Sequence, residues 1–521
     1  MTATTTPSGA GFAGLLRAEW TKLRSVRRWA LTMLAAIALT VLISLLSAAS
    51  SSFQTMGGSA PPIGPDGVQV QDTFRFVHQP MTGNGEVTAR VLEQSGVEGV
   101  IAGWAKAGIM IKDGARPGAR YAAMLLTPGH GVRWQTNFVV DRAGSAGGTA
   151  PVWLRLTRTG DTLTGYESTD GTNWRQVGSA ELSGLPETAE VGIFVASPNF
   201  VRVERQFSGT SVSATPTWST ARFDNVGVRP AGAPSAAQWR DEEIGVIGLG
   251  GPDAAGGPAA PEGPGAPDTP DLPDAARVSG VPDSTGASTV TGTGDVAPRA
   301  PDEDLTRMSL SGVLIGLMPI VALGALFVTA EYRRGMIRTT FAASPRRGRV
   351  LAAKSLVLGA ATFVAGLVAC VTAFLASQPG QRASGYKPPY FPSQSLLDWP
   401  VSRAVVGTAL VLALVAVFSL AVGTILRRSA AAITAVIVLI VLPQMVAGAL
   451  PLTAAQWLMR LTPAAGLSIQ QTAPRYEHVA GICLPESGCF VDGPWVGVGV
   501  LCGYVAVAVA VAYWLLRRRD A

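Results

Sequence analysis

Six long apolar runs, almost free of charged residues, constrain this chain more than any other feature. They cover Trp29–Ala48, Leu310–Ala330, Val350–Ala376, Ala404–Leu426, Ala430–Leu450 and Trp495–Leu516. A helix of about 20 apolar residues crosses the ~30 Å hydrocarbon core of a bilayer. Because a backbone in lipid must satisfy its own hydrogen bonds, each run is predicted to be a transmembrane helix.

The placement of charge supports this prediction. Charged residues make up 15% of the chain, against about 25% in an ordinary soluble protein. The net charge of +6 could suit a nucleic-acid binder, but the basic residues cluster beside the apolar runs, as membrane topology requires. The first run is longer than the core of a usual signal peptide, so it is expected to be a retained helix.

Basic residues also predict the orientation. If the N-terminus is cytoplasmic, 17 Lys and Arg residues flank the runs on the inner side. The two short outer loops hold five, namely Arg382, Lys387, Arg403, Arg460 and Arg475. The positive-inside rule therefore predicts a multi-pass protein of the plasma membrane with both termini cytoplasmic. Residues 51–305 are then extracytoplasmic.

The segment 67–228 has a different pattern. Short runs alternate apolar and polar residues, as in 152–156, 162–166 and 191–195. Asp170-Gly171 lies between two such runs and is a strong signal for a hairpin turn. Many short strands at this spacing predict an antiparallel β-sandwich.

Residues 229–305 are crowded with Pro, Gly, Ala, Ser and Asp. Such a segment buries too little apolar surface to offset its conformational entropy, so it is expected to be a disordered tether. The predicted fold is an α-helical polytopic membrane protein of six transmembrane helices, with an all-β sandwich inserted after the first. Its parts are an interfacial segment (1–28), the first span (29–49), the sandwich, the tether and a helical region (306–521).

Two further segments resemble surface helices. Residues 15–24 mix apolar side chains with Arg17, Lys22 and Arg24, which fits a short interfacial helix or a plain basic anchor. The loop 331–349 begins with Glu331 at the end of the second run, where a carboxylate is costly unless it is paired. Arg333 or Arg334 is the expected partner, and Arg334 is better placed. By periodicity alone, the basic residues of this loop need only set topology.

A family resemblance changes that interpretation. The loop has Glu331-Tyr332-Arg333-Arg334-Gly335, then Arg338 and Thr340, then Ser344-Pro345-Arg346-Arg347 with Arg349 and Lys354. This pattern resembles the loop between the second and third helices of ABC-2 type transporter permeases, especially actinobacterial ones. Residues 17–25 are similar to the elbow helix of that family, and 461–466 to the region before its last helix. The insertion at 51–305 departs from the family, and it leaves the substrate open.

The resemblance implies that this chain is the permease subunit of an exporter. The segment 336–343 would be a coupling helix that contacts a separate cytoplasmic ATP-binding subunit, through Glu331, Arg334, Gly335, Met336, Ile337, Arg338 and Phe341. Two permease copies, identical or paired, would line the path. The chain's five lysines all lack a preceding glycine, so it has no P-loop and binds no cofactor itself. ATP would bind the partner subunit, and no nucleic acid is expected.

The outer sandwich resembles concanavalin-like domains of the laminin-G or DUF1349 type, on the strength of residues 104–112, 166–174 and 221–226. Several such domains bind sugars, so Trp104, Trp134, Trp153 and Trp174 are candidates for stacking on a ligand. Aromatic residues in such strands are more often core. The alternative function is therefore an envelope-anchored protein that binds or senses a glycan or another ligand.

The remaining motifs are sparse. Cys483 and Cys489 flank a polar loop and can form a disulfide if that loop faces an oxidising compartment. The sequence holds three scattered histidines and no H-E-x-x-H, C-x-x-C or G-x-S-x-G motif. We therefore expect no metal site and no enzymatic activity in this chain. Few ionisable residues lie inside the runs, which favours ATP-driven work and an apolar or amphipathic substrate.

Overall fold

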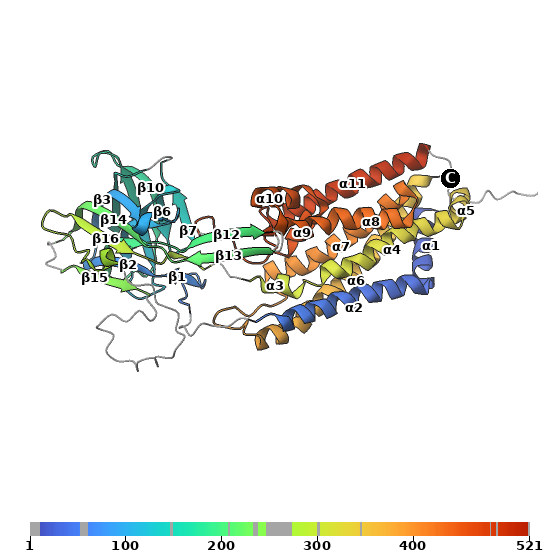
Figure 1. The fold of residues 1–521 in the computed structure, drawn as a ribbon, viewed down its shortest axis with the longest axis horizontal. Helices are drawn as coiled ribbons and strands as arrows, with labels where there is room; N and C mark the ends of the chain where they lie inside the picture. Colours follow the sequence, from blue (N-terminus) through green and yellow to red (C-terminus); the bar gives the residue numbers. More distant parts are fainter. Residues whose placement is uncertain are drawn as a thin grey trace, which may run out of the picture.

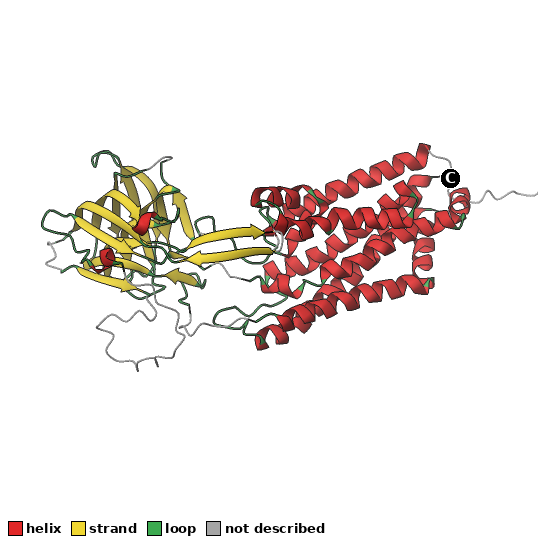
Figure 2. Cartoon of the chain, viewed as in Figure 1, coloured by secondary structure: helices red, strands yellow, loops and turns green. Residues whose placement is uncertain are grey.

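The computed structural model describes residues 11–52, 61–145, 149–206, 209–232, 238–245, 273–299, 303–343, 346–479, 481–485 and 488–518. Strands and helices are segregated into a β-sandwich and a helical bundle that lie end to end (Figures 1 and 2). The chain forms the first two helices, then the sandwich, then the rest of the bundle. The N- and C-terminal helices α1 and α11 thus belong to one body.

The sandwich consists of two large antiparallel sheets. The first has the order β10 (Arg175–Glu181), β9 (Thr162–Ser168), β8 (Val152–Thr159), β3 (Gly85–Gly96), β14 (Ser219–Pro230) and β16 (Ser288–Gly292). The second has the order β15 (Arg240–Ile244), β2 (Phe74–Thr82), β11 (Thr188–Ala196), β4 (Lys106–Lys112), β5 (Tyr121–Thr127), β6 (Gly131–Thr136) and β7 (Val140–Ala143). Two smaller ribbons pair β1 (Val70–Asp72) with β17 (Val296–Pro298), and β12 (Phe200–Gln206) with β13 (Gly209–Thr215).

The core between the two sheets follows from the alternation in the sequence. In β8, Leu154 and Leu156 are buried, while Trp153 and Arg155 between them are half-buried on the other face. Trp134 is fully buried at the centre, and a Cβ at Gly165 or Gly178 would lie within 2.4 Å of its ring. These glycines therefore make room for the indole. The predicted β-sandwich is confirmed.

The prediction of a disordered tether over 229–305 is wrong for much of its described part. β15 pairs with β2, β16 with β14 and β17 with β1. These short strands add Ile244, Val290 and Val296 to the cores. Their low average hydropathy hid them, because strands of three to five residues gain their stability from the strands they pair with elsewhere in the chain. Residues 246–272 lie outside the described part of the chain.

A second core covers the far face of the seven-stranded sheet. Phe74, Phe76 and Tyr121 are buried there beneath β1, β17 and the adjoining loops. Two lysines of β4 are also fully buried on this face. Lys112 Nζ lies 2.7 Å from Asp72 Oδ2, and Lys106 forms an ion pair with Asp295. One member of each pair thus comes from a strand or loop that covers the sheet.

The bundle contains five helices long and apolar enough to cross a membrane. They are α2 (Arg27–Ser50), α4 (Val313–Arg333), α6 (Arg347–Ala383), α7 (Trp399–Leu426) and α11 (Pro494–Arg518). The first, third, fourth and sixth predicted spans each fall within one of these helices, and the second, Leu310–Ala330, begins three residues before α4. Shorter helices are α1 (Phe12–Ser25), α3 (Leu305–Ser309) and α5 (Met336–Ala343).

The fifth predicted span is broken. It consists of α8 (Ser429–Ile440) and the segment Leu442–Ala449, which is made of α9 (Leu442–Val446) and a 3-10 turn (Ala447–Ala449), and the two parts meet at 42°. Pro443 lies at the start of α9, where its missing N–H and its ring prevent α8 from continuing. The described residues thus form five candidate spans, or six if the bent pair counts as one. After the break come α10 (Leu452–Leu461) and a 3-10 helix (Pro463–Gln470).

The sandwich contacts the bundle through its β12–β13 hairpin, which reaches the bundle beside α9 and α10 (Figure 1). Arg205 Nη1 donates hydrogen bonds to the carbonyls of Ala447 at 3.1 Å and Leu450 at 2.6 Å. The carbonyls of a helix's last turn have no partner within the helix. An arginine of the sandwich therefore caps the end of the broken fifth span.

Candidate coupling site at the α1–α5 end of the bundle

The end of the bundle opposite the sandwich carries α1, α5 and the end of α11 (Figure 1). Helix α1 places Leu23 and Glu19 toward the bundle, and both are buried. The chain then leaves the helical conformation at Val26, with φ −91° and ψ 98°, before α2 begins. This break lets α1 pack across α6 instead of extending α2.

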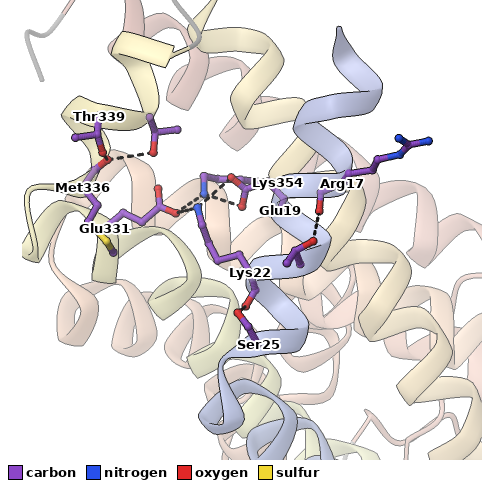
Figure 3. Close-up of polar contacts among 10 residues, drawn as sticks. Arg17, Glu19, Lys22, Ser25, Glu331, Met336, Thr339 and Lys354 are labelled. Carbon is purple, nitrogen blue, oxygen red and sulfur yellow. Dashed lines mark hydrogen bonds and ion pairs between the residues drawn. The ribbon is translucent and has the colours of Figure 1, made fainter. Parts of the chain in front are cut away.

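Four charged side chains meet between α1, α4 and α6 (Figure 3). Lys354 Nζ lies 2.6 Å from Glu331 Oε1 and 3.0 Å from Glu19 Oε2. Lys22 Nζ lies 2.5 Å from the same oxygen of Glu331 and 3.2 Å from Glu19 Oε1. We call Glu19, Lys22, Glu331 and Lys354 the charge cluster. Two anions and two cations alternate, so every contact is attractive.

The charge cluster is deeply buried. Glu19, Glu331 and Lys354 are 4%, 2% and 2% exposed, and only Lys22 reaches solvent. Burial lowers the pKa of Lys22, but its hydrogen bond to Glu331 and the nearby carboxylates outweigh this and raise the pKa above its ordinary value. Because each buried charge is costly without a partner, the cluster holds α1 to α4 and α6.

Aromatic rings close the apolar side of the cluster. Lys354 Nζ lies 5.2 Å from the centroid of the Phe327 ring, a cation–π distance. Trp29, at the start of α2, contacts the same ring with centroids 4.9 Å apart. Glu331 Oε2 has no hydrogen-bond partner among the described residues.

The turn from α4 to α5 depends on Gly335, whose φ of +69° favours glycine. Helix α5 then begins with Met336, which is 40% exposed, and Ile337, which is 5% exposed. Thr339 and Thr340 donate hydrogen bonds to the Met336 carbonyl. Helix α5 therefore buries the Ile337 side chain and exposes the Met336 side chain to solvent.

The predictions for the arginines and Phe341 of this loop have different outcomes. The expected pairing of Glu331 with Arg333 or Arg334 is wrong. Arg334 is exposed, and Arg333 Nη2 donates to Ser429 Oγ at 2.9 Å. The backbone of Arg338 and Phe341 lies in α5, but their side chains lie outside the described part of the chain. Ser344 and Pro345 of the same motif also lie outside the described part of the chain.

Sequence reasoning missed the partners of Glu331. Lys22 is 309 positions away and Lys354 is 23 positions away, so no local spacing links them. One signal was present, since Lys354 stands alone on an apolar helix and a charge in that setting requires a partner.

A basic groove of about 700 Å³ opens at the same end of the bundle, between the start of α6 and the end of α11. Arg346, Arg347, Arg349 and Arg517 line it, together with Tyr513. Arg347 Nη1 donates to the Leu516 carbonyl at 2.6 Å, which fixes the two helix ends to each other.

The four tryptophans predicted to stack on a ligand have different surroundings. Trp134 is 0% exposed, so the prediction that it stacks on a ligand is wrong; it fills the core. Trp104 stacks on His130 with centroids 3.6 Å apart. Trp153 packs against Arg90 at 5.8 Å. The Arg155 guanidinium lies 4.3 Å from the centroid of the Trp174 ring and 4.8 Å from that of the Tyr166 ring. These three indoles are half-buried.

Cys483 and Cys489 form a disulfide with Cα atoms 5.1 Å apart, in the segment between the 3-10 helix and α11 at the sandwich end. Cys370 and Cys502 are free thiols in α6 and α11. Among the described residues, no group of three or more His, Cys, Asp and Glu side chains could hold a metal ion.

Comparisons with known proteins show likeness only in part of the chain. No family model and no curated protein matches it. Among solved structures, a mutant of a GH43 protein from Bacillus licheniformis is 19% identical with a TM-score of 0.17, over 21% of this chain and 24% of that one. A functionally unknown protein from Saccharomyces cerevisiae is 19% identical with a TM-score of 0.21, over 35% of this chain and 94% of that one. Scytalido-glutamic peptidase is 16% identical with a TM-score of 0.22, over 32% and 87%.

Proposed function

We propose that this chain is the membrane-spanning permease subunit of an ABC-2 type exporter, driven by a separate cytoplasmic ATP-binding subunit. The observation that carries the proposal is the short helix α5, which follows the first long helix after the sandwich and presents Met336 to solvent. The charge cluster supports it, because it joins α1 to the residue that precedes the α4–α5 turn. In the membrane orientation that we propose, α5 and both termini are cytoplasmic and the sandwich is extracytoplasmic.

The mechanism follows from these contacts. A protein that pushes or turns α5 acts on Gly335 and then on Glu331, because only a four-residue stretch separates Glu331 from Met336. Glu331 binds Lys22 of α1 and Lys354 of α6. A force on α5 therefore reaches three helices through charges that cannot separate cheaply in a buried site. The cluster would move α1, α4 and α6 as one unit.

The test is affinity purification of the full-length chain from its native membrane, followed by mass spectrometry. We expect an ATPase with a Walker A motif in the eluate, and its loss when residues 336–341 are scrambled. Undiminished co-purification with the scrambled segment would contradict the proposal.

A second function, an envelope-anchored ligand-binding protein, is supported by the outer face of the six-stranded sheet. There the Arg155 guanidinium packs against both Tyr166 and Trp174, and Trp153 lies two positions away on the same strand. Such rings can stack on a sugar. Glycan-array binding by the full chain that is lost in Trp174→Ala, with no ATPase partner in the eluate, would favour this function over transport.

A further inference from the structure

Cationic side chains line the basic groove between α6 and α11. Four arginines and no acidic residue line it among the described residues. Arg346, Arg349 and Arg517 are exposed. The N-terminus of α6 opens into the same place, and no side chain caps it. The N–H groups of a helix's first turn carry partial positive charge and favour an anion. The groove is therefore built to receive negative charge.

The groove also has an apolar wall. Leu351 and Ala352 of α6 and Val509 of α11 line it beside the arginines. Both helices are candidate membrane spans, and these residues lie toward the bilayer side of the arginines. The Tyr513 ring closes against α6 because Gly348 has no Cβ, which would lie 2.6 Å from the ring. A cationic rim above an apolar wall is the pattern that an anionic amphiphile fits, whereas a soluble protein surface would leave the wall unfilled.

We propose that this groove binds an anionic phospholipid of the inner leaflet, with its phosphate among Arg346, Arg349 and Arg517 and an acyl chain along Val509. The proposal rests on the membrane orientation in the proposed function, but not on the ATPase partner. About 700 Å³ far exceeds the volume of one phosphate ion, since a water molecule occupies about 30 Å³. The lipid would bridge the ends of α6 and α11, beside the loop that carries α5.

The test is native mass spectrometry of the full-length protein, titrated in detergent with phosphatidylglycerol or phosphatidylcholine. We expect tighter binding of phosphatidylglycerol. Since each arginine near an anionic lipid contributes about fivefold in affinity, the triple variant Arg346→Gln, Arg349→Gln, Arg517→Gln should lose about 100-fold. The matched control is Arg24→Gln, Arg27→Gln, Arg28→Gln, which removes the same charge from exposed positions at the same end and should lose far less.

Two further experiments separate the contribution of the apolar wall to lipid affinity from that of the arginines. Val509→Trp fills the apolar wall and keeps every arginine, so it should abolish lipid binding without changing the elution profile of the folded protein. Inorganic phosphate should not displace the lipid. Equal losses in the two triple variants would mean diffuse attraction and overturn the proposal, and so would displacement by phosphate alone. Lipid binding that survives while no ATPase co-purifies would contradict only the proposed function.

Discussion

The sandwich and the helical bundle both bury charged side chains, and they arrange them differently. In the sandwich the buried lysines are in separate pairs, Lys112 with Asp72 and Lys106 with Asp295. In the bundle, Lys354 and Lys22 share Glu331 and Glu19. The sandwich pairs fasten covering segments to a sheet. The bundle cluster joins three helices from distant parts of the sequence, so one contact can lengthen while the others hold.

The Lys112–Asp72 pair of the sandwich shows what it costs to bury charged groups. Burial raises the pKa of Asp72 and lowers that of Lys112, although each faces its opposite charge. For this pair desolvation thus outweighs attraction, as is common in a dry interior. The pairs in the sandwich are rigid attachments with little tolerance for change, whereas the shared cluster in the bundle is suited to transmit movement.

The largest expected effect comes from breaking an isolated pair. Lys112→Met leaves the Asp72 carboxyl buried without its partner, and should destabilise the sandwich by about 3–5 kcal/mol. Hydrogen exchange of the β4 and β5 amides in the full-length protein measures this loss. The double variant Lys112→Met, Asp72→Asn removes both charges and should recover most of the stability. A double variant as unstable as the single one would refute the description of this pair as isolated.

A smaller effect is expected from the shared cluster. In Lys354→Met, Glu331 keeps its contact with Lys22, so the loss should be about 2–3 kcal/mol, below that of a pair broken outright. Thermal unfolding in detergent, with hydrogen exchange of α1, measures it. Lys387→Met, at an exposed position, is the control and should change little. A loss in Lys354→Met larger than that in Lys112→Met would remove the distinction between the two regions.

The contact between the sandwich and the bundle should contribute less stability than the charged pairs inside either one. Arg205→Ala removes two hydrogen bonds from a charged group that is only half-buried, which is worth about 1–2 kcal/mol. Amides at 447–450 should then exchange faster, while those of the sandwich core should not. Arg202→Ala, an exposed arginine on the same strand, is the matched control. Equal exchange in the two variants would show that Arg205 does not hold the end of the fifth span.

The smallest effect concerns pH at the same junction. His478 Nε2 lies 2.7 Å from the Phe138 carbonyl of the sandwich, and burial lowers the pKa of His478 below its ordinary 6.5. The docked form therefore holds fewer protons than the released form, so the contact is fully stable above pH 6.5 and weakens as the pH falls through the lowered pKa. Asp141 and Asp295 oppose this shift and Lys106 supports it. The protection of the amides around Phe138, relative to their intrinsic base-catalysed exchange at each pH, should fall on acidification, and His478→Gln should abolish that pH dependence.

Local signals in the sequence predicted much of the fold. The apolar runs, the alternation in β8 and the Asp170-Gly171 turn depend on neighbouring residues. The strands in 240–298 were missed because their stability comes from the partners Phe74, Ser219 and Val70 in other segments. At the coupling site, Gly335 and Glu331 were recognised from a motif. The contacts of Glu331 with Lys22 and Lys354 were missed because they depend on how three helices pack.

The central claim is that the α1–α5 end of the bundle binds a separate ATPase. The most direct measurement compares co-purification from the native membrane for the natural chain and two scrambled variants. One scrambles residues 336–341 of α5, and the other scrambles α10, a short helix of similar length at the sandwich end. The account predicts that an ATPase with a Walker A motif accompanies the natural chain and the α10 variant, and is lost from the α5 variant. An ATPase that stays with the α5 variant, or is absent from all three, would contradict it.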